Sequence, residues 1–420
     1  MKRMTRGGLA LTLVCSLLFL LSWNPGGFAQ GETAEASDAA LAALVAANTQ
    51  FAFDLYRVLR EDSGNLFFSP YSISSALAMA YAGASGETET QMAEVLHFAT
   101  LGQDGVHPAF NALARELASR GEDVDDMDEE ARFRLHVANA LWGQDGYSFI
   151  DEFLAILTES YGAGIQTIDF AGAPEQARET INQWVSDETE GRIEDLLPPG
   201  SVDALTRLVL ANAITFNATW EYGFDPLFTW ESPFTLLDGS QVPVQMMEQV
   251  ARLRYAAGEG YCAVELPYVG GELSMLVLLP EIGAFETFTA ALDSQRLSTI
   301  LATLSEDEPV SLQMPRFEVT SEFEFTELLA DLGMTDVFVF GNADFSGMDG
   351  TRNLFLGGVF HKAFVSVDEN GTEAAAATAA PIPCALLPTI HLDHPFVFLI
   401  RDMKTGAILF VGQVTNPSEV

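Results

Sequence analysis

The chain has 420 residues, of which 48% are hydrophobic and 10% aromatic, so it can bury a large core and does not have the composition of a disordered polypeptide. Its 20 basic and 59 acidic residues give a formal charge of −39, which excludes nucleic acid and anionic membranes as electrostatic partners and disfavours heparin. Three Cys are too few for a disulfide scaffold. The sequence also lacks motifs for a metal site or a phosphate-binding cofactor, so we expect neither metal nor cofactor.

Residues 1–29 have the organisation of an export signal. A basic start precedes an apolar run over 9–23, and small residues allow cleavage after Ala29. The alternative is a membrane anchor, but the run is short for a spanning helix, which needs about 20 apolar residues. We expect a secreted or, alternatively, periplasmic protein. Its mature chain would begin with a small polar tail over 30–37 and carry a charge of −42.

The hydrophobic pattern of the mature chain alternates between helical and strand periods. Helices are predicted over 38–59, from Ser69-Pro70 onward, over 175–193 and over 321–332, strands over 208–215 and 264–279, and a hairpin over 395–414. Neither a repeat nor a linker interrupts this order. The simplest interpretation is one α+β domain over 38–420.

Residues 370–389 differ from the rest of the chain in composition and hydrophobic pattern. They contain a run of Ala and Thr followed by three Pro, without an amphipathic period, and strand-like segments flank them. A long irregular loop inside a compact domain is uncommon and usually functional. The alternative is a passive insertion.

Several segments, in order along about 38–417, resemble the serpin family, and in particular its secreted, prokaryotic-type serine protease inhibitors. These segments are 65–73, 139–142, 181–197, 210–214, 264–268, 396–400 and 410–417, and the strongest is Asp-Glu-Asn-Gly-Thr-Glu-Ala-Ala-Ala-Ala-Thr at 368–378.

The resemblance implies an α+β serpin-like fold with three β-sheets, eight or nine helices and an exposed reactive-centre loop at about 369–392. It also implies a monomeric suicide inhibitor of serine proteases. The target protease would cleave the loop and form an acyl-enzyme, and the cleaved loop would insert into the main sheet and trap the covalent complex. An enzyme is the first rival, but neither a His-Glu-x-x-His nor a Gly-x-Ser-x-Gly motif is present.

The same resemblance assigns a hinge at the start of the loop. Its residues are Glu369, Gly371, Thr372, Glu373, Ala374, Ala375, Ala376, Ala377 and Thr378. On a strand, Thr372, Ala374, Ala376, Thr378 and Ala380 share one face, and all five are small and uncharged, which suits insertion. The rival is a non-inhibitory binding or storage protein of the same fold, whose hinge would carry bulky, charged or Pro residues.

Two expectations about the intact hinge follow. Gly371 should supply backbone freedom. Thr372 should lie near the exposed hinge before cleavage, so that Thr372→Arg would slow insertion while leaving the intact fold almost unchanged.

Six further residues are assigned by the resemblance to the region where the main sheet opens. A polar cluster beneath its centre comprises Ser69, Ser72, Asn212 and His361, and an ion pair of Arg316 with Glu369 lies at its top beside Trp220. Alone, His361 would be interpreted as a core histidine and the two charges as surface residues.

The bond to be cleaved lies at one of two neighbouring positions, with Cys384, Ala385 and Leu386 as the candidate residues. The candidate residues before the cleaved bond are small and uncharged, which favours an elastase-like or subtilisin-like serine protease over a trypsin-like one. A cysteine protease is the alternative target. Pro381 and Pro383 suit a central strand poorly, so insertion should stop before them. Because the loop must travel, we expect Cys262 and Cys384 to be free thiols.

Overall fold

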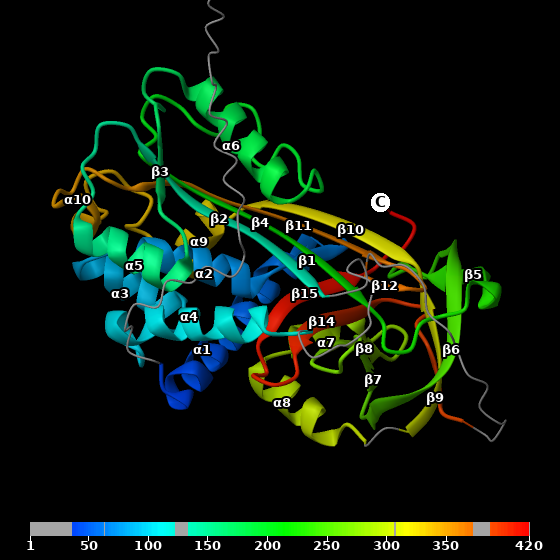
Figure 1. Ribbon diagram of the computed structural model, residues 1–420. Helices are drawn as coiled ribbons and strands as arrows, with labels where there is room; N and C mark the ends of the chain where they lie inside the picture. Colours follow the sequence, from blue (N-terminus) through cyan, green and yellow to red (C-terminus); the bar gives the residue numbers. More distant parts are fainter. Residues whose placement is uncertain (1–35, 63, 122–132, 306–307, 373–386, 420) are drawn as a thin grey trace, which may run out of the picture. The chain divides into compact units, whose positions relative to one another are not determined.

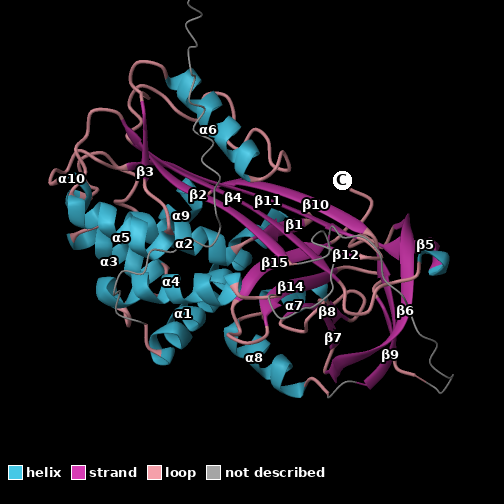
Figure 2. Ribbon diagram, viewed as in Figure 1, coloured by secondary structure: helices cyan, strands magenta, loops and turns pink. Residues whose placement is uncertain are grey.

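The computed structural model describes residues 36–62, 64–121, 133–305, 308–372 and 387–419. Within them the chain forms ten α-helices and fifteen strands (Figures 1 and 2). The helices are α1 (Asp38–Leu59), α2 (Pro70–Tyr81), α3 (Gly86–Val95), α4 (Gly102–Ala118), α5 (Asp151–Tyr161), α6 (Pro174–Glu188), α7 (Phe285–Ala290), α8 (Ser294–Thr303), α9 (Thr326–Leu332) and α10 (Ser346–Asp349). The strands are β1 (Leu66–Phe68), β2 (Arg134–Gln144), β3 (Ile165–Ile168), β4 (Leu208–Thr219), β5 (Thr229–Thr235), β6 (Gln241–Gly258), β7 (Tyr261–Pro267), β8 (Leu273–Pro280), β9 (Glu308–Pro315), β10 (Phe317–Glu324), β11 (Leu356–Val367), β12 (Gly371–Thr372), β13 (Thr389–His391), β14 (Phe396–Asp402) and β15 (Ile408–Val414).

The starts of the first two long helices follow from their capping residues. Ser37 precedes α1, and its side chain accepts the Ala40 N–H at 3.2 Å. Ser69 caps α2 in the same way, and Pro70 occupies the first helical position, where a missing N–H costs nothing. Both helix starts predicted from the sequence are confirmed, as is the β14–β15 hairpin.

The strands form a six-stranded sheet and a nine-stranded sheet. The first has the order β10-β11-β12-β4-β2-β3. The second is divided by its longest strand, since β6 pairs with β5 and β9 over 241–253 but with β7 over 254–258. Three sheets were expected, and they correspond to the six-stranded sheet and the two parts that share β6.

Side chains on β4 alternate between two hydrophobic cores, as a strand period of two requires. Leu210 and Ile214 belong to the main core, with β14, β15 and α2. Ala211 and Ala213 point to the opposite face and pack in a smaller core with α6. Figure 1 accordingly shows α6 on one side of the six-stranded sheet and α2 on the other.

The prediction of one helix over 321–332 was wrong in its first part. Residues up to Glu324 belong to β10, where Phe317, Val319 and Ser321 are buried and the residues between them are exposed. The helix α9 begins only at Thr326. The helix predicted over 175–193 likewise ends at Glu188.

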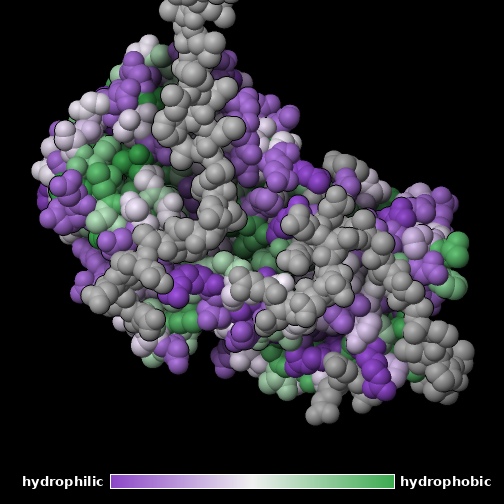
Figure 3. All heavy atoms as spheres, in the orientation of Figure 1, coloured by the Kyte–Doolittle hydropathy of each residue, from purple (hydrophilic) through white to green (hydrophobic). Residues whose placement is uncertain are grey.

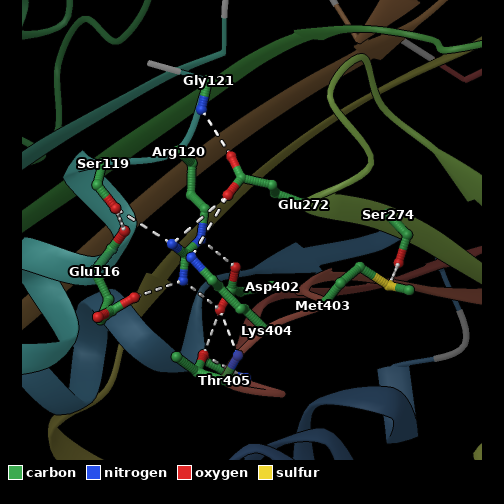
Figure 4. A network of polar contacts seen from close by, with 11 residues as sticks. Glu116, Ser119, Arg120, Gly121, Glu272, Ser274, Asp402, Met403, Lys404 and Thr405 are labelled. Carbon is green, nitrogen blue, oxygen red and sulfur yellow. Dashed lines mark hydrogen bonds and ion pairs between the residues drawn. The ribbon is translucent and has the colours of Figure 1, made fainter. Parts of the chain in front are cut away.

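A buried ionic network joins the end of α4 to the β14–β15 turn (Figure 4). The Arg120 guanidinium donates to both carboxylate oxygens of Asp402, at 2.7 and 3.2 Å, and to Glu116 at 3.1 Å. The Arg120 side chain is 1% exposed and that of Asp402 is 0% exposed. Burial alone would raise the pKa of Asp402, but the hydrogen bonds from Arg120 and Thr405 hold it below its usual value.

Candidate functional site

The central feature of the six-stranded sheet is a parallel pair that separates at one end. Residues 208–215 of β4 lie beside 356–364 of β11 in parallel register. Beyond this stretch β12 lies between them and is antiparallel to both, so that Thr372 is opposite Ala218 on β4 and Val367 on β11. The sheet therefore already holds the first two residues of an additional central strand.

Gly371 is required here for close packing. A Cβ atom at this position would lie 2.2 Å from the Ala218 carbonyl oxygen and 2.8 Å from the Thr219 Cα. A real Cβ never approaches backbone so closely, so any other residue would push β12 out of the sheet. The expectation that Gly371 serves for backbone freedom is replaced by this steric reason.

Thr372 is fully buried, which contradicts the expectation that it is exposed before cleavage. Its hydroxyl lies 2.9 Å from the Tyr268 hydroxyl, and Tyr268 stacks on Trp220 with ring centroids 4.6 Å apart. The expectation failed because the gap between β4 and β11 is wide enough at this end to admit the residue in the intact chain.

Glu369 and Arg316 form the expected ion pair just before β12. Arg316 Nε lies 2.9 and 2.8 Å from the two Glu369 carboxylate oxygens, and the side chains are 45% and 4% exposed, respectively. Burial would raise the pKa of Glu369, but hydrogen bonds from Arg316 and Thr229 hold it below its usual value. Trp220 adds an indole N–H bond to the Asp368 carbonyl at 3.1 Å.

The expected polar cluster lies where β4 and β11 are still paired. His361 on β11 is opposite Asn212 on β4 and hydrogen-bonds to its side-chain oxygen through Nδ1. The Ser69 N–H donates to His361 Nε2 at 3.3 Å, so Nε2 carries no proton. Burial lowers the pKa of His361 to about 3, which keeps the ring neutral. Asn212 donates in turn to Ser72 Oγ at 2.6 Å.

Parting β4 from β11 at this level has to break the contact between His361 and Asn212. The cluster therefore fastens the two strands at the point that an inserting strand would reach.

The loop itself falls mostly outside the described residues. The hinge residues Glu373, Ala374, Ala375, Ala376, Ala377 and Thr378 and the bond candidates Cys384, Ala385 and Leu386 all lie there. The chain is described again from Leu387, and the Pro388 carbonyl accepts the Ser311 N–H at 2.9 Å as β13 joins β9 in parallel.

Three residues of the site were missed by the sequence reasoning. Asn139 accepts from Ser72 Oγ at 3.1 Å and is opposite Asn212 in the β2–β4 register. Thr229 bonds to Glu369, and Tyr268 bonds to Thr372. Asn139 and Tyr268 stand in the segments that carried the resemblance, but their contacts depend on strand register that sequence alone does not reveal.

The described residues include no group of three or more His, Cys, Asp or Glu side chains arranged to hold a metal ion. None of the helices within the described ranges combines the length and hydropathy needed to cross a bilayer. Cys262, on β7, is a free thiol, and burial raises its pKa. Cys384 and the expected signal over 1–29 lie beyond the described part of the chain.

Comparison with known proteins agrees with this geometry. The family model described as serpin (serine protease inhibitor) matches residues 46–417. The human protein named leukocyte elastase inhibitor is 41% identical over 387 residues, covering 89% of this chain and 99% of its own. Serpin B6 of Pongo abelii is 41% identical over 383 residues, with the same two coverages. The structure of uncleaved ovalbumin superimposes with a TM-score of 0.79 at 32% identity, covering 89% of this chain and 100% of its own.

These relatives lend no support to the narrower expectation of a prokaryotic-type member, since the two sequence relatives are mammalian proteins. The match over nearly all of the described chain, the β12 strand between β4 and β11, and the Arg316–Glu369 pair agree on one assignment: this chain belongs to the serpin family.

Proposed function

We propose that the protein is a suicide inhibitor of an elastase-like or subtilisin-like serine protease. The observation that carries the proposal is β12, which occupies the first two positions of a strand site between β4 and β11. Loop insertion as an added strand is the known behaviour of serpins. The residues that follow β12 in this chain have the small size that such a strand site requires.

The register of β12 assigns a position to each residue that would follow. Continued without a bulge, it brings Thr378 between Asn212 and His361, because β12 pairs antiparallel with both flanking strands. Ala374 and Ala376 would face the main core, beside buried residues of β4 and β11. Ala375 and Ala377 would face the other side, where α6 covers the sheet. Apart from Glu373, which directly follows β12, these residues are small on both faces, so the strand could enter without displacing either core.

The chemistry begins with the target protease. Its serine oxygen attacks the carbonyl carbon of Cys384 or Ala385, an ester bond forms, and the peptide bond to the next residue breaks with its nitrogen taking up a proton. The new chain end then inserts with the protease attached. About ten ladder hydrogen bonds at 0.5–1.5 kcal/mol each contribute on the order of 5–15 kcal/mol to this step.

The small residues before the cleaved bond support the choice of target, since the loop residues from 378 to 390 include neither Arg nor Lys. The relatives named leukocyte elastase inhibitor support it as well. Incubation with human leukocyte elastase, subtilisin, trypsin and papain, followed by denaturing electrophoresis, tests the proposal. We expect a covalent complex with elastase or subtilisin. Cleavage of the loop by every protease with full activity remaining would refute inhibition and favour the binding or storage alternative, and a complex with papain alone would favour the cysteine protease alternative.

We also propose that the protein is exported as a monomer and acts without heparin. The support is the signal-like pattern of residues 1–29 and the charge of −39. Between residues 96 and 120 the only basic side chains besides His are Arg115 and Arg120, and Arg120 is buried. Amino-terminal sequencing of protein recovered outside the producing cells should begin at residue 30. Acceleration of inhibition by heparin would contradict the second part.

A further inference from the structure

An apolar surface is exposed beside the base of the reactive loop. It comprises Leu227 (87% exposed), Phe228 (59%), Tyr222 (41%) and Trp230 (39%), all within nine residues. Figure 3 shows hydrophobic side chains gathered at the right-hand edge, next to the place of β5 in Figure 1. Large apolar side chains that gather on a surface with a polar rim mark binding sites more often than scattered ones do. We call these four residues the η3 patch, after the 3-10 turn η3 (Pro226–Phe228).

The η3 patch is held in place by its own backbone and by Glu369. The Phe224 N–H donates to the Glu369 carbonyl at 2.8 Å, and the Thr229 hydroxyl bonds to the Glu369 carboxylate. Between these two anchors, Asp225 accepts the N–H groups of the next turn, at 2.9 Å through its side chain and 2.8 Å through its carbonyl. The backbone that carries Leu227 and Phe228 is therefore held relative to Glu369, where the loop begins, and a surface on an ordered backbone loses less entropy on binding.

The other end of the loop returns to the same sheet. β5 follows the patch and pairs with β6, β6 pairs with β9, and β9 pairs with β13, where the chain emerges from the loop at Thr389. The patch is thus fixed to one end of the loop and shares a sheet with the other. A protease that grips the loop between these ends has to approach this edge of the molecule.

The charges around the patch favour a basic partner. Glu221 and Glu231 are exposed and Asp225 is half-buried, whereas the Arg316 guanidinium nearby is occupied by Glu369. A second copy of the chain would bring another charge of −39 to the same edge and be repelled. We propose that the η3 patch is a secondary docking surface for the body of the target serine protease, which contacts it through an apolar area with a basic rim. This proposal rests on the proposed inhibitory function.

The test compares two double variants of the full chain. In the first, Leu227→Asn and Phe228→Ser remove the centre of the patch. In the matched control, Leu205→Asn and Phe340→Ser remove a Leu and a Phe that are 70% and 66% exposed. Leu205 precedes the far end of β4, about 40 Å from Trp220 at the rise of a strand.

Two measurements separate docking from loop chemistry. The first is the rate constant of inhibition of human leukocyte elastase, or of subtilisin if that protease is trapped faster. The second is the dissociation constant for the same protease with its catalytic serine replaced by Ala, which docks but cannot acylate. For the patch variant we expect the rate constant of inhibition to fall at least tenfold and the dissociation constant to rise at least tenfold. The number of inhibitor molecules used per protease and the melting temperature should not change. The control should stay within twofold of wild type.

Equal values for wild type and patch variant would overturn the docking proposal while leaving the inhibitory function intact. Absence of any covalent complex with wild type would instead refute the inhibitory function, and binding to the inactive protease would still report on the patch. Sedimentation of wild type as a dimer that the patch variant abolishes would show that the surface serves self-association, which also overturns the proposal.

Discussion

The Tyr268 and Thr372 hydroxyls lie 2.9 Å apart, inside a sheet end that is almost closed to solvent. The start of the loop is therefore already seated in the intact chain and contributes to its stability.

Thr372→Arg should destabilise the uncleaved protein. An Arg at this position would either lose its hydration without a partner or force β12 out of the sheet, at a cost of about 2–4 kcal/mol in the free energy of unfolding. Thr372→Val keeps the shape and loses only the hydroxyl, for about 1 kcal/mol. Urea denaturation measures both. If the Arg variant is as stable as wild type, Thr372 does not occupy the sheet before cleavage.

Thr378→Val should raise the number of inhibitor molecules used per protease inactivated. In the continued register Thr378 separates Asn212 from His361, and its hydroxyl is the group able to bond with them after insertion. Without that bond, insertion slows and hydrolysis of the ester competes. Thr378→Ser retains the hydroxyl and serves as the control. Equal ratios for the Val and Ser variants would refute this placement.

Acid should weaken the fold through His361. Its pKa is about 3 in the folded protein against an ordinary value of 6.5, so the unfolded chain takes up a proton that the folded chain does not. The contribution of His361 to stability is complete above pH 6.5 and falls by about 2 kcal/mol between pH 7 and pH 5. The free energy of unfolding of His361→Gln should therefore depend less on pH over this range. Parallel curves for the two proteins would contradict the assignment.

Arg316→Ala should lower the free energy of unfolding, because it leaves the buried Glu369 carboxylate without its main partner. The expected loss is only about 1–3 kcal/mol, because the Arg316 guanidinium is half-exposed and solvent screens the pair. The pKa of Glu369 is below its ordinary 4.5, so the difference from wild type should shrink as the pH falls below that value. Arg57→Ala removes an exposed ion pair with Asp54 and should change stability by less than about 0.5 kcal/mol. Equal effects of the two variants, measured by urea denaturation at pH 7, would contradict the prediction.

Arg120→Ala should lower the free energy of unfolding by about 3–5 kcal/mol, because Asp402 would remain buried with its charge uncompensated. The double variant Arg120→Met with Asp402→Leu removes both charges and should recover part of that loss. Thermal and urea denaturation of the three proteins provide the comparison. A double variant less stable than Arg120→Ala would show that Asp402 stabilises the fold through its hydrogen bonds from Thr405 even without Arg120.

Elements marked by interactions between residues close in sequence could be predicted, whereas elements that depend on pairing with a distant strand could not. Ser37 and Ser69 mark their helix starts because a cap acts within three residues. The helix predicted from 321 failed because the alternating burial of β10 depends on pairing with β11. The pairing of Arg316 with Glu369, 53 residues apart, was predicted only through the family resemblance.

The burial of Thr372 could not be predicted even with the resemblance. It depends on how far β4 and β11 separate at one end, and neither strand carries a local signal for that separation. The roles of Thr229 and Tyr268 were missed for the same reason, because Thr229 bonds to Glu369 just before β12 and Tyr268 bonds to Thr372 within it.

The two short strands that flank the loop belong to different sheets, β12 to the six-stranded one and β13 to the nine-stranded one. Residues 373–388 join these two strands, so insertion of the whole loop in an uncut chain would require β13 to release β9. In the proposed mechanism one cut removes that restraint, and the new chain ends would move apart by the length of a sheet, too far to be rejoined. The trigger is thus a covalent bond and not a bound ligand. In this mechanism insertion has no reverse step, so each inhibitor molecule stays cleaved and inserted after the concentration of free protease has fallen.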